Sequence, residues 1–185
     1  MVLGSAQPEG HVDAGVAARA GLEIARRRSG GGAVLVGPGR CAWVDLLIGR
    51  DDPRWDDDVD RAPRWVGEVW ADALGEVGVT GATVVSGMQP SPWSSRVCFA
   101  GAGPGEVRVT GRKLVGLSQR RTRRRALFQC AVLLDADPAP LLDVLVLSDD
   151  ERRQAAGVWS AGTLALEPAR VEPLLGALAR GLAER

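Results

Sequence analysis

Residues 106–134 read EVRVTGRKLVGLSQRRTRRRALFQCAVLL, and this stretch predicts the centre of an antiparallel sheet. EVRVT alternates polar and apolar residues, Thr110–Gly111 can form a turn, and RKLVGLSQR returns as a second strand. ALFQCAVLL at 126–134 is a third strand, and RVCFA at 96–100 is predicted as a strand that precedes them. Because short connections join antiparallel neighbours, we expect a meander.

The segments outside this meander add two strands and several helices. CAWVDLLI at 41–48 is predicted as a buried strand, and ATVVS at 82–86 as a shorter one. The predicted helices are residues 62–77, 138–147, 149–159 and 168–184. Asp149 or Asp150 is the expected N-cap of the third helix. Since strands and helices mix without regular βαβ alternation, the pattern predicts an α+β fold with a largely antiparallel mixed sheet flanked by helices.

The composition is that of a single globular domain spanning residues 1–185. Hydrophobic residues make up 45% and charged residues 25%, which argues against general disorder. No apolar run approaches the roughly 20 residues of a membrane helix, and the start is unlike a secretory signal, so we predict a cytoplasmic protein without membrane contact. His11 is the only histidine, which removes most Ser-His-Asp and multi-histidine chemistries. Trp43 and Trp65 are the tryptophans most expected in the core.

Lys113 is a conspicuous residue, because the other 22 of the 23 basic residues are arginines. A lysine retained in such a chain indicates a place where a compact ammonium is required, although chance survival on the surface is an equal alternative. Strict alternation places Lys113 on one face of its strand with Val115 and Leu117. Gly116 and Ser118 then face the other side. No carboxylate is expected nearby, so this ammonium would need an anion such as a bound phosphate, unless it is simply an exposed strand lysine.

RRRSGGGAV at residues 26–34 is the second segment that carries chemistry. Gly30, Gly31 and Gly32 let a ligand approach the main chain, and their amides can line an anion pocket. The preceding arginines add positive charge and Ser29 adds a hydroxyl. The segment is neither a P-loop nor a dinucleotide fingerprint. The alternative is a flexible glycine loop beside solvated arginines.

Together these segments resemble the catalytic domain shared by lipoate-protein ligases, octanoyltransferases and biotin ligases. RRRSGGGAV is similar to the R-R-x-S-G-G-G-A-V motif of lipoate-protein ligases, and GRKLVGLSQRR at 111–121 to their G-[RK]-K-[ILV]-x-G-x-[SA]-Q-x-R motif. LGSAQP at 3–8 is similar to the G-x-x-Q segment that precedes the glycine motif. The similarity runs over about residues 2–135 in the family's order, and lipoate-protein ligases are the closest match.

The resemblance implies an ATP-dependent lipoate-protein ligase. Such an enzyme joins lipoate to AMP with Mg²⁺ present and passes the lipoyl group to a lysine of an acceptor domain. The acceptors would be lipoyl domains of 2-oxoacid dehydrogenase complexes or the glycine cleavage H protein. Lys113 is the family's catalytic lysine by position, and its charge would stabilise the developing negative charge. The residues that match the substrate- and nucleotide-binding positions are Arg27, Ser29, Gly30, Gly31, Gly32, Ala33, Gly116 and Ser118.

Cys98 supports a second interpretation. Some octanoyltransferases of this superfamily carry a cysteine just before the lysine strand and transfer an octanoyl or lipoyl group through a thioester without ATP. RVCFAGAGPGEVRVTGRK at 96–113 resembles that stretch, and Cys98 lies in the matching place. A half-buried core cysteine is the alternative, and Cys41 and Cys130 are predicted to be core residues. The three cysteines form no C-x-x-C pair, so we predict free thiols and no metal site.

Several features set this chain apart from the family pattern. The strand and helix that usually precede the G-x-x-Q segment do not stand before it here. Either the natural start lies upstream of Met1, or the protein is a non-catalytic acyl-binding relative, which is the third interpretation. Glu106 is the nearest match to an acidic residue that ligases often carry before the lysine. RRTRRR at 120–125 is interpreted as a solvated strand end or a docking edge for an acidic acceptor. It lacks interleaved aromatic residues, so no nucleic-acid partner is predicted.

Overall fold

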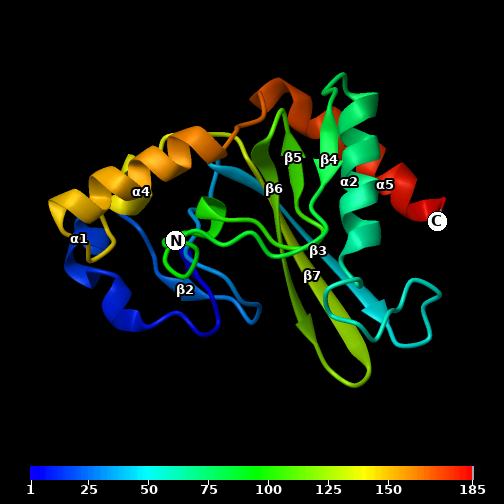
Figure 1. The fold of residues 1–185 in the computed structure, drawn as a ribbon, viewed down its shortest axis with the longest axis horizontal. Helices are drawn as coiled ribbons and strands as arrows, with labels where there is room; N and C mark the ends of the chain where they lie inside the picture. The colour runs from blue at the N-terminus through cyan, green and yellow to red at the C-terminus, as the bar shows by residue number, and fades with distance from the viewer. Residues whose placement is uncertain (185) are drawn as a thin grey trace.

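Five strands form one antiparallel sheet in the order β3-β7-β6-β5-β4 in the computed structural model, which describes residues 1–184 (Figure 1). The strands are β3 (Cys41–Gly49), β4 (Ala82–Val84), β5 (Val107–Val109), β6 (Arg112–Arg121) and β7 (Arg125–Leu133). Strands β5, β6 and β7 are the predicted meander, and β6 and β7 make its long projecting hairpin. The α+β class and the antiparallel sheet are therefore confirmed.

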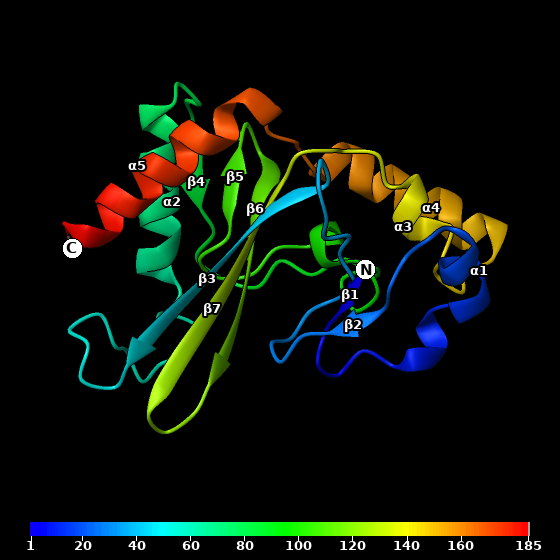
Figure 2. The same ribbon diagram turned by 180° about the vertical axis from the view of Figure 1, so that it is seen from behind.

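Two helices, α2 (Arg64–Glu76) and α5 (Val171–Ala183), cover one face of this sheet (Figure 2). The short turn η3 (Pro168–Arg170) leads into α5. The apolar stripes of the helices, with Trp70 and Leu174 fully buried, pack on sheet residues such as Phe128. This confirms the predicted helices at 62–77 and 168–184 to within a few residues.

The other half of the molecule is built from short elements around a second apolar cluster. Its elements are β1 (Val2–Leu3), η1 (Glu9–His11), α1 (Ala14–Arg19), β2 (Ala25–Arg26), η2 (Cys98–Ala100), α3 (Ala139–Leu142) and α4 (Asp149–Gly162). Strands β1 and β2 pair in parallel as a separate two-stranded sheet. The ribbon views from both sides place this half beside the large sheet, away from α2 and α5 (Figures 1 and 2).

Three local predictions were wrong for identifiable reasons. Ser148, not Asp149 or Asp150, caps α4, because its hydroxyl accepts from the Glu151 amide while the Glu151 carboxylate accepts from the Ser148 amide. β3 is an edge strand rather than a buried one, and only its even-numbered side chains pack in the cluster under α2 and α5, so Leu47 on the other face is 59% exposed. Residues 96–100 contain the single 3₁₀ turn η2 instead of a strand.

The tryptophans also differ from expectation. The fully or almost fully buried ones are Trp70, Trp93 and Trp159. Trp43 and Trp65 are only half-buried, since Trp43 lies on the edge strand and Trp65 in the first turn of α2. The Arg54 guanidinium covers the exposed side of Trp65, 4.9 Å from the ring centre.

A β-bulge between β5 and β6 changes the face on which Lys113 lies. Val107 pairs with Val115 but Arg108 pairs with Lys113, so Leu114 is an extra residue in β6. Leu114 and Val115 therefore both pack in the cluster under α2 and α5. Lys113 falls on the opposite face with Gly116, whose hypothetical Cβ would lie 3.4 Å from the Lys113 Cε. Strict alternation, which grouped Lys113 with Val115 and Leu117, was wrong here.

Among residues 1–184, no helix is both long and apolar enough to cross a lipid bilayer.

The packing of α5 on the sheet predicts a large cost for Leu174→Ala. Leu174 is 1% exposed, so its truncation leaves a cavity and lowers the free energy of unfolding by about 2–5 kcal/mol. Leu47→Ala is the matched control, because Leu47 on the outer edge of β3 is exposed and its loss changes stability by less than about 0.5 kcal/mol. Urea unfolding followed by tryptophan fluorescence measures both, and equal losses would contradict this placement of the core.

Candidate active site

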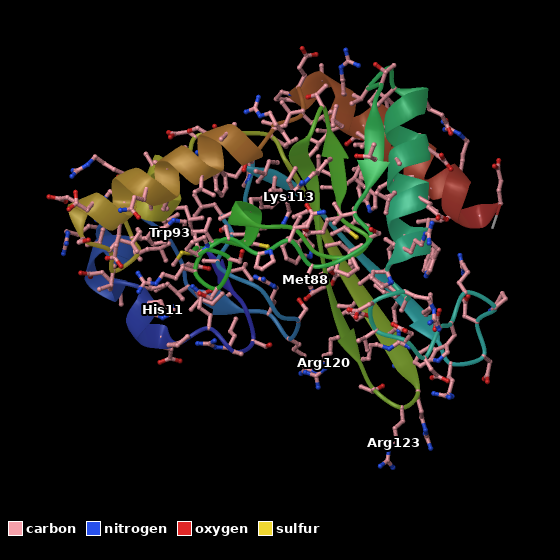
Figure 3. All side chains as sticks on the ribbon, viewed as in Figure 1. His11, Met88, Trp93, Lys113, Arg120 and Arg123 are labelled. Atoms are coloured by element: carbon pink, nitrogen blue, oxygen red, sulfur yellow. The ribbon has the colours of Figure 1, made fainter. Side chains whose placement is uncertain are left out.

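A cleft of about 270 Å³ opens between the glycine loop and strand β6. Its lining includes Gly30, Gly31, Met88, Cys98, Gly101, Glu106, Lys113, Leu117 and Ser118. Lys113 occupies the centre of the molecule, whereas His11 and Trp93 lie in the half built from short elements (Figure 3). The structure thus brings the glycine loop, Cys98 and Lys113, which are far apart in the sequence, to one cavity.

Arg27 braces the glycine loop from inside the protein. Its side chain is almost fully buried. Its guanidinium donates to the Gly30 carbonyl oxygen at 2.6 Å from Nη2 and 3.2 Å from Nε, and to the Gly32 carbonyl oxygen at 2.9 Å. A further bond at 3.4 Å reaches the Val2 carbonyl oxygen in β1. The loop conformation is therefore set by carbonyl groups that point back to Arg27.

Two close backbone contacts explain why glycine is required at Gly32 in the loop and at Gly4 in the segment packed against it. A Cβ at Gly32 would lie 2.4 Å from the Val97 amide nitrogen, and a Cβ at Gly4 would lie 1.7 Å from the Gly31 carbonyl oxygen. Ala33 then pairs with the segment before η2, since the Cys98 amide donates to the Ala33 carbonyl oxygen at 3.0 Å. The loop and η2 are thus held directly against each other.

The amides of Gly30, Gly31 and Gly32 donate to no acceptor within residues 1–184. Gly31 adopts φ +96°, a left-handed conformation that suits glycine, and it lies at the cleft beside the Cys98 thiol. Consecutive free amides of this kind can stabilise an oxyanion or bind an anionic group.

Ser29 connects the loop to the large sheet. Its hydroxyl lies 2.8 Å from the Ser118 hydroxyl and donates to the Gln129 Oε1 at 2.7 Å. The Gln129 amide nitrogen donates in turn to Asp45 on β3 at 3.1 Å. Gln129 was not predicted as a site residue, although a lone polar residue inside the apolar ALFQCAVLL segment was the available signal.

Gln7 is the glutamine of the G-x-x-Q segment, which the sequence matched to the family without assigning this residue a role. It is 4% exposed, and its side-chain nitrogen donates to the Arg96 carbonyl oxygen at 3.1 Å. The Gly4 amide donates to its Oε1 at 3.4 Å. The LGSAQP segment therefore ties the first strand to the chain that leads into η2.

The Lys113 ammonium is fully engaged by protein groups. Its Nζ lies 2.8 Å from the Glu106 Oε2 and donates to the carbonyl oxygens of Cys98 and Gly101 at 2.9 and 3.0 Å. An ammonium has three donors, so none is left over. The Phe99 ring lies 4.7 Å from the Nζ and adds a cation–π contact. The expectation that no local carboxylate would accompany Lys113 was wrong, because the bulge turns the lysine toward Glu106.

Cys98 is half-buried at the first position of η2 and lines the cleft. Its Sγ lies 3.9 Å from the Arg27 Nη2. All three cysteines are free thiols, but burial raises the pKa of Cys41 to about 11 and that of Cys130 to about 12. Both are core residues as predicted, which leaves Cys98 as the thiol that the cleft exposes.

The arginine-rich segment 120–125 lies outside the cleft lining. Arg120 and Arg123 project from the β6–β7 hairpin, with Arg123 near its tip (Figure 3). The Arg121 side chain turns back and stacks on Trp55, 4.3 Å from the ring centre. In the described part of the chain, no three His, Cys, Asp or Glu residues gather closely enough to hold a metal ion.

Comparison with known proteins identifies the family. Residues 1–170 match the model of the lipoyl protein ligase A/B catalytic domain. The chain belongs to this family. A lipoyl ligase catalytic domain of this kind was expected from the two motifs, and both the resemblance and the fold are confirmed.

Relatives with curated names or solved structures include both activities of the family. The octanoyltransferase LipM of Kyrpidia tusciae is 38% identical over 97 residues, which is 49% of this chain and 35% of that protein. The bipartite lipoate protein ligase described with its E2 lipoyl domain from Thermoplasma acidophilum has a TM-score of 0.76 at 20% identity and covers 99% of this chain. Lipoate-protein ligase A bound with ATP has a TM-score of 0.68 at 22% identity. This chain spans 66% and 67% of those two structures, whose likeness establishes the fold.

The burial of two cysteines predicts one reactive thiol in the folded protein. At pH 8 only about one molecule in a thousand carries a Cys41 thiolate, and fewer carry a Cys130 thiolate, because both pKa values are raised. A chromogenic disulfide reagent should therefore titrate one equivalent rapidly in the folded wild type and none in Cys98→Ala. Unfolding in guanidinium should release three equivalents in the wild type. Rapid reaction of more than one thiol before unfolding would contradict this.

The contact between the loop and η2 predicts that Gly32→Ala is destabilising. Its Cβ would overlap the Val97 backbone, so the free energy of unfolding should fall by about 1–3 kcal/mol. Gly30→Ala is the control, since a Cβ there meets nothing within 4 Å and the change should stay below about 0.5 kcal/mol. Urea unfolding distinguishes the two, and equal behaviour would count against this packing.

Proposed function

We propose that the chain transfers a lipoyl or octanoyl group through a thioester on Cys98. The observation that supports this most directly is the contrast between the two candidate groups in the cleft. The Cys98 thiol lines the cavity and is free, whereas the Lys113 ammonium has all its donors occupied by the protein. A free thiol is available to react with an acyl carbonyl, and an ammonium without a free donor is not available to hold a phosphate.

The reaction takes two balanced steps. The Cys98 thiolate attacks the carbonyl carbon of an acyl group bound as a thioester to a carrier protein. The bond to the carrier sulfur breaks, and the carrier leaves as a thiol once it takes up a proton. The amine of an acceptor lysine then attacks the Cys98 thioester, loses a proton, and forms an amide while the Cys98 thiol is released. Each attack places negative charge on the carbonyl oxygen, which the free glycine amides beside Cys98 would stabilise.

The substrates and partners of this proposal follow from the family. The Thermoplasma acidophilum ligase is described with an E2 lipoyl domain, and a related structure holds lipoic acid. We propose an acceptor lysine on a lipoyl domain of a 2-oxoacid dehydrogenase complex or on the glycine cleavage H protein. A reaction through a free thiol requires reducing conditions, so we propose a cytoplasmic setting.

ATP-dependent ligation is the second candidate. Its support is the glycine loop with free amides, together with a structural neighbour that binds ATP. In that reaction lipoate and ATP, with Mg²⁺, would form lipoyl-adenylate and pyrophosphate, and the acceptor lysine would displace AMP. Lys113 would first have to break a bond to Glu106 or to a carbonyl in order to reach the phosphate. Retention of bound acyl-adenylate without turnover would instead identify a non-catalytic binding protein.

Removal of the Cys98 thiol tests the proposal. With an octanoyl-carrier protein and an apo lipoyl domain, we expect the wild type to form the amide without ATP. Cys98→Ala should reduce the rate at least about a thousandfold, because the covalent intermediate cannot form. Cys41→Ala, which removes a buried thiol, should keep most of the activity. Mass spectrometry of the acceptor measures the product, and an octanoyl adduct on the wild type locates the thioester.

The opposite outcome is equally informative. If Cys98→Ala retains activity with lipoate and ATP, and the wild type is inactive without ATP, the chain is a ligase and the thioester proposal is wrong.

A further inference from the structure

The ion pair between Glu106 and Lys113 differs from every other ion pair within residues 1–184, because both of its side chains are buried. They are 5% and 2% exposed, whereas the other pairs lie at least partly in solvent. A buried ion pair rarely adds stability over an apolar pair of the same size, since both charges lose their hydration. We therefore ask which neighbouring groups the Glu106–Lys113 pair holds in place in the cleft.

The Glu106 carboxylate collects three donors from two segments. Its Oε2 accepts from the Gly103 amide at 2.9 Å and from Lys113, while its Oε1 accepts from the Leu117 amide at 3.0 Å. Val107, the first residue of β5, pairs with Val115, so the Leu117 amide lies beyond the paired part of the two strands. The carboxylate takes the place of a strand partner there and joins β6 to the loop that precedes β5.

Lys113 carries this connection on to the turn that holds the thiol. Its ammonium donates to the carbonyl oxygens of Cys98 and Gly101, the residues that begin and follow η2. The turn is three residues long, and within it the Ala100 amide donates to the Val97 carbonyl oxygen at 3.2 Å. From outside, the Cys98 amide donates to the Ala33 carbonyl oxygen at 3.0 Å, and the Thr163 hydroxyl donates to the Phe99 carbonyl oxygen at 3.5 Å. The ammonium therefore binds the carbonyl groups at both ends of this turn.

We propose that Glu106 is a positioning residue that acts through Lys113 to fix the turn bearing Cys98. The carboxylate keeps the ammonium charged, buried and aimed at the two carbonyl groups, and the ammonium holds the thiol against the glycine loop. The catalytic consequence rests on the proposed function of Cys98. The structural part, that Glu106 orders residues 98–103, does not depend on it.

Hydrogen exchange tests the structural part directly. Glu106→Gln keeps the shape of the side chain but removes its negative charge. Because both carboxylate oxygens accept hydrogen bonds, the new amide nitrogen must face a donor, either the Leu117 amide or the Gly103 amide and the Lys113 ammonium. We expect the backbone amides of residues 98–103 to exchange at least tenfold faster in this variant than in the wild type, with peptides from α5 unchanged. Glu76→Gln is the matched control, because Glu76 forms an exposed 2.8 Å ion pair with Arg180 away from the cleft. Its exchange at 98–103 should equal that of the wild type.

Transfer kinetics separate positioning from simple destabilisation. In Glu106→Gln we expect kcat for octanoyl transfer to fall at least tenfold, while KM for the acyl carrier changes less than threefold. Glu106→Asp keeps the charge and should recover part of kcat. The double variant Glu106→Gln/Lys113→Met removes both buried charges, so its stability should return toward the wild type. Its kcat should stay low, because the turn still lacks its clamp.

The outcomes distinguish this inference from the proposed function. Wild-type exchange at residues 98–103 in Glu106→Gln would overturn the positioning role and leave the case for Cys98 untouched. If both the stability and kcat of the double variant returned to wild-type values, the positioning role would also be overturned, because Glu106 would then affect only folding. Full transfer activity of Cys98→Ala would overturn the thioester proposal, and the exchange result would still stand.

Discussion

A buried ammonium must have both its charge and its hydrogen-bond donors satisfied, and this requirement at Lys113 organises the cleft. The bulge in β6 sends the side chain to the cleft face, and Glu106 supplies the counter-charge. The remaining donors have only carbonyl oxygens to bind, and these belong to the turn that carries Cys98. The hydrogen bonds of Lys113 therefore help to fix the position of the Cys98 thiol.

The second constraint is the close contact between the glycine loop and the chain around η2. Gly32 sits where any side chain would overlap the Val97 backbone, and Arg27 draws the loop carbonyls inward. Turning carbonyls inward leaves the loop amides without protein acceptors. The loop thus presents free amide donors beside Cys98, and donors of this kind can stabilise an oxyanion.

The sequence predicted elements whose signal is local. The meander, α2 and α5 were found because their apolar periodicity is continuous, and the two motifs identified the family. Side-chain direction in β6 was mispredicted, because a single extra residue at Leu114 reverses the alternation and leaves no mark in the residue pattern. Trp43 was placed in the core because apolar content cannot reveal that β3 is at the edge of the sheet. The Glu106–Lys113 pair was missed because of the bulge, which turns Lys113 toward Glu106 and cannot be recognised in the residue pattern.

The same cleft can serve two chemistries that differ in what carries the activated acyl group. An adenylate needs a cation free to hold its phosphate, whereas a thioester needs a thiol held at a fixed place and donors for the carbonyl oxygen. In this chain the Lys113 ammonium already binds Glu106 and the two carbonyl oxygens of the turn that carries Cys98. Freeing it for a phosphate would take the counter-charge from Glu106, which would keep only the Gly103 and Leu117 amides as donors. It would also take the ammonium donor from the Cys98 and Gly101 carbonyl oxygens, which is costly for buried polar groups. The arrangement therefore supports the proposed reaction through the thiol, in which the lysine would act by keeping Cys98 in place.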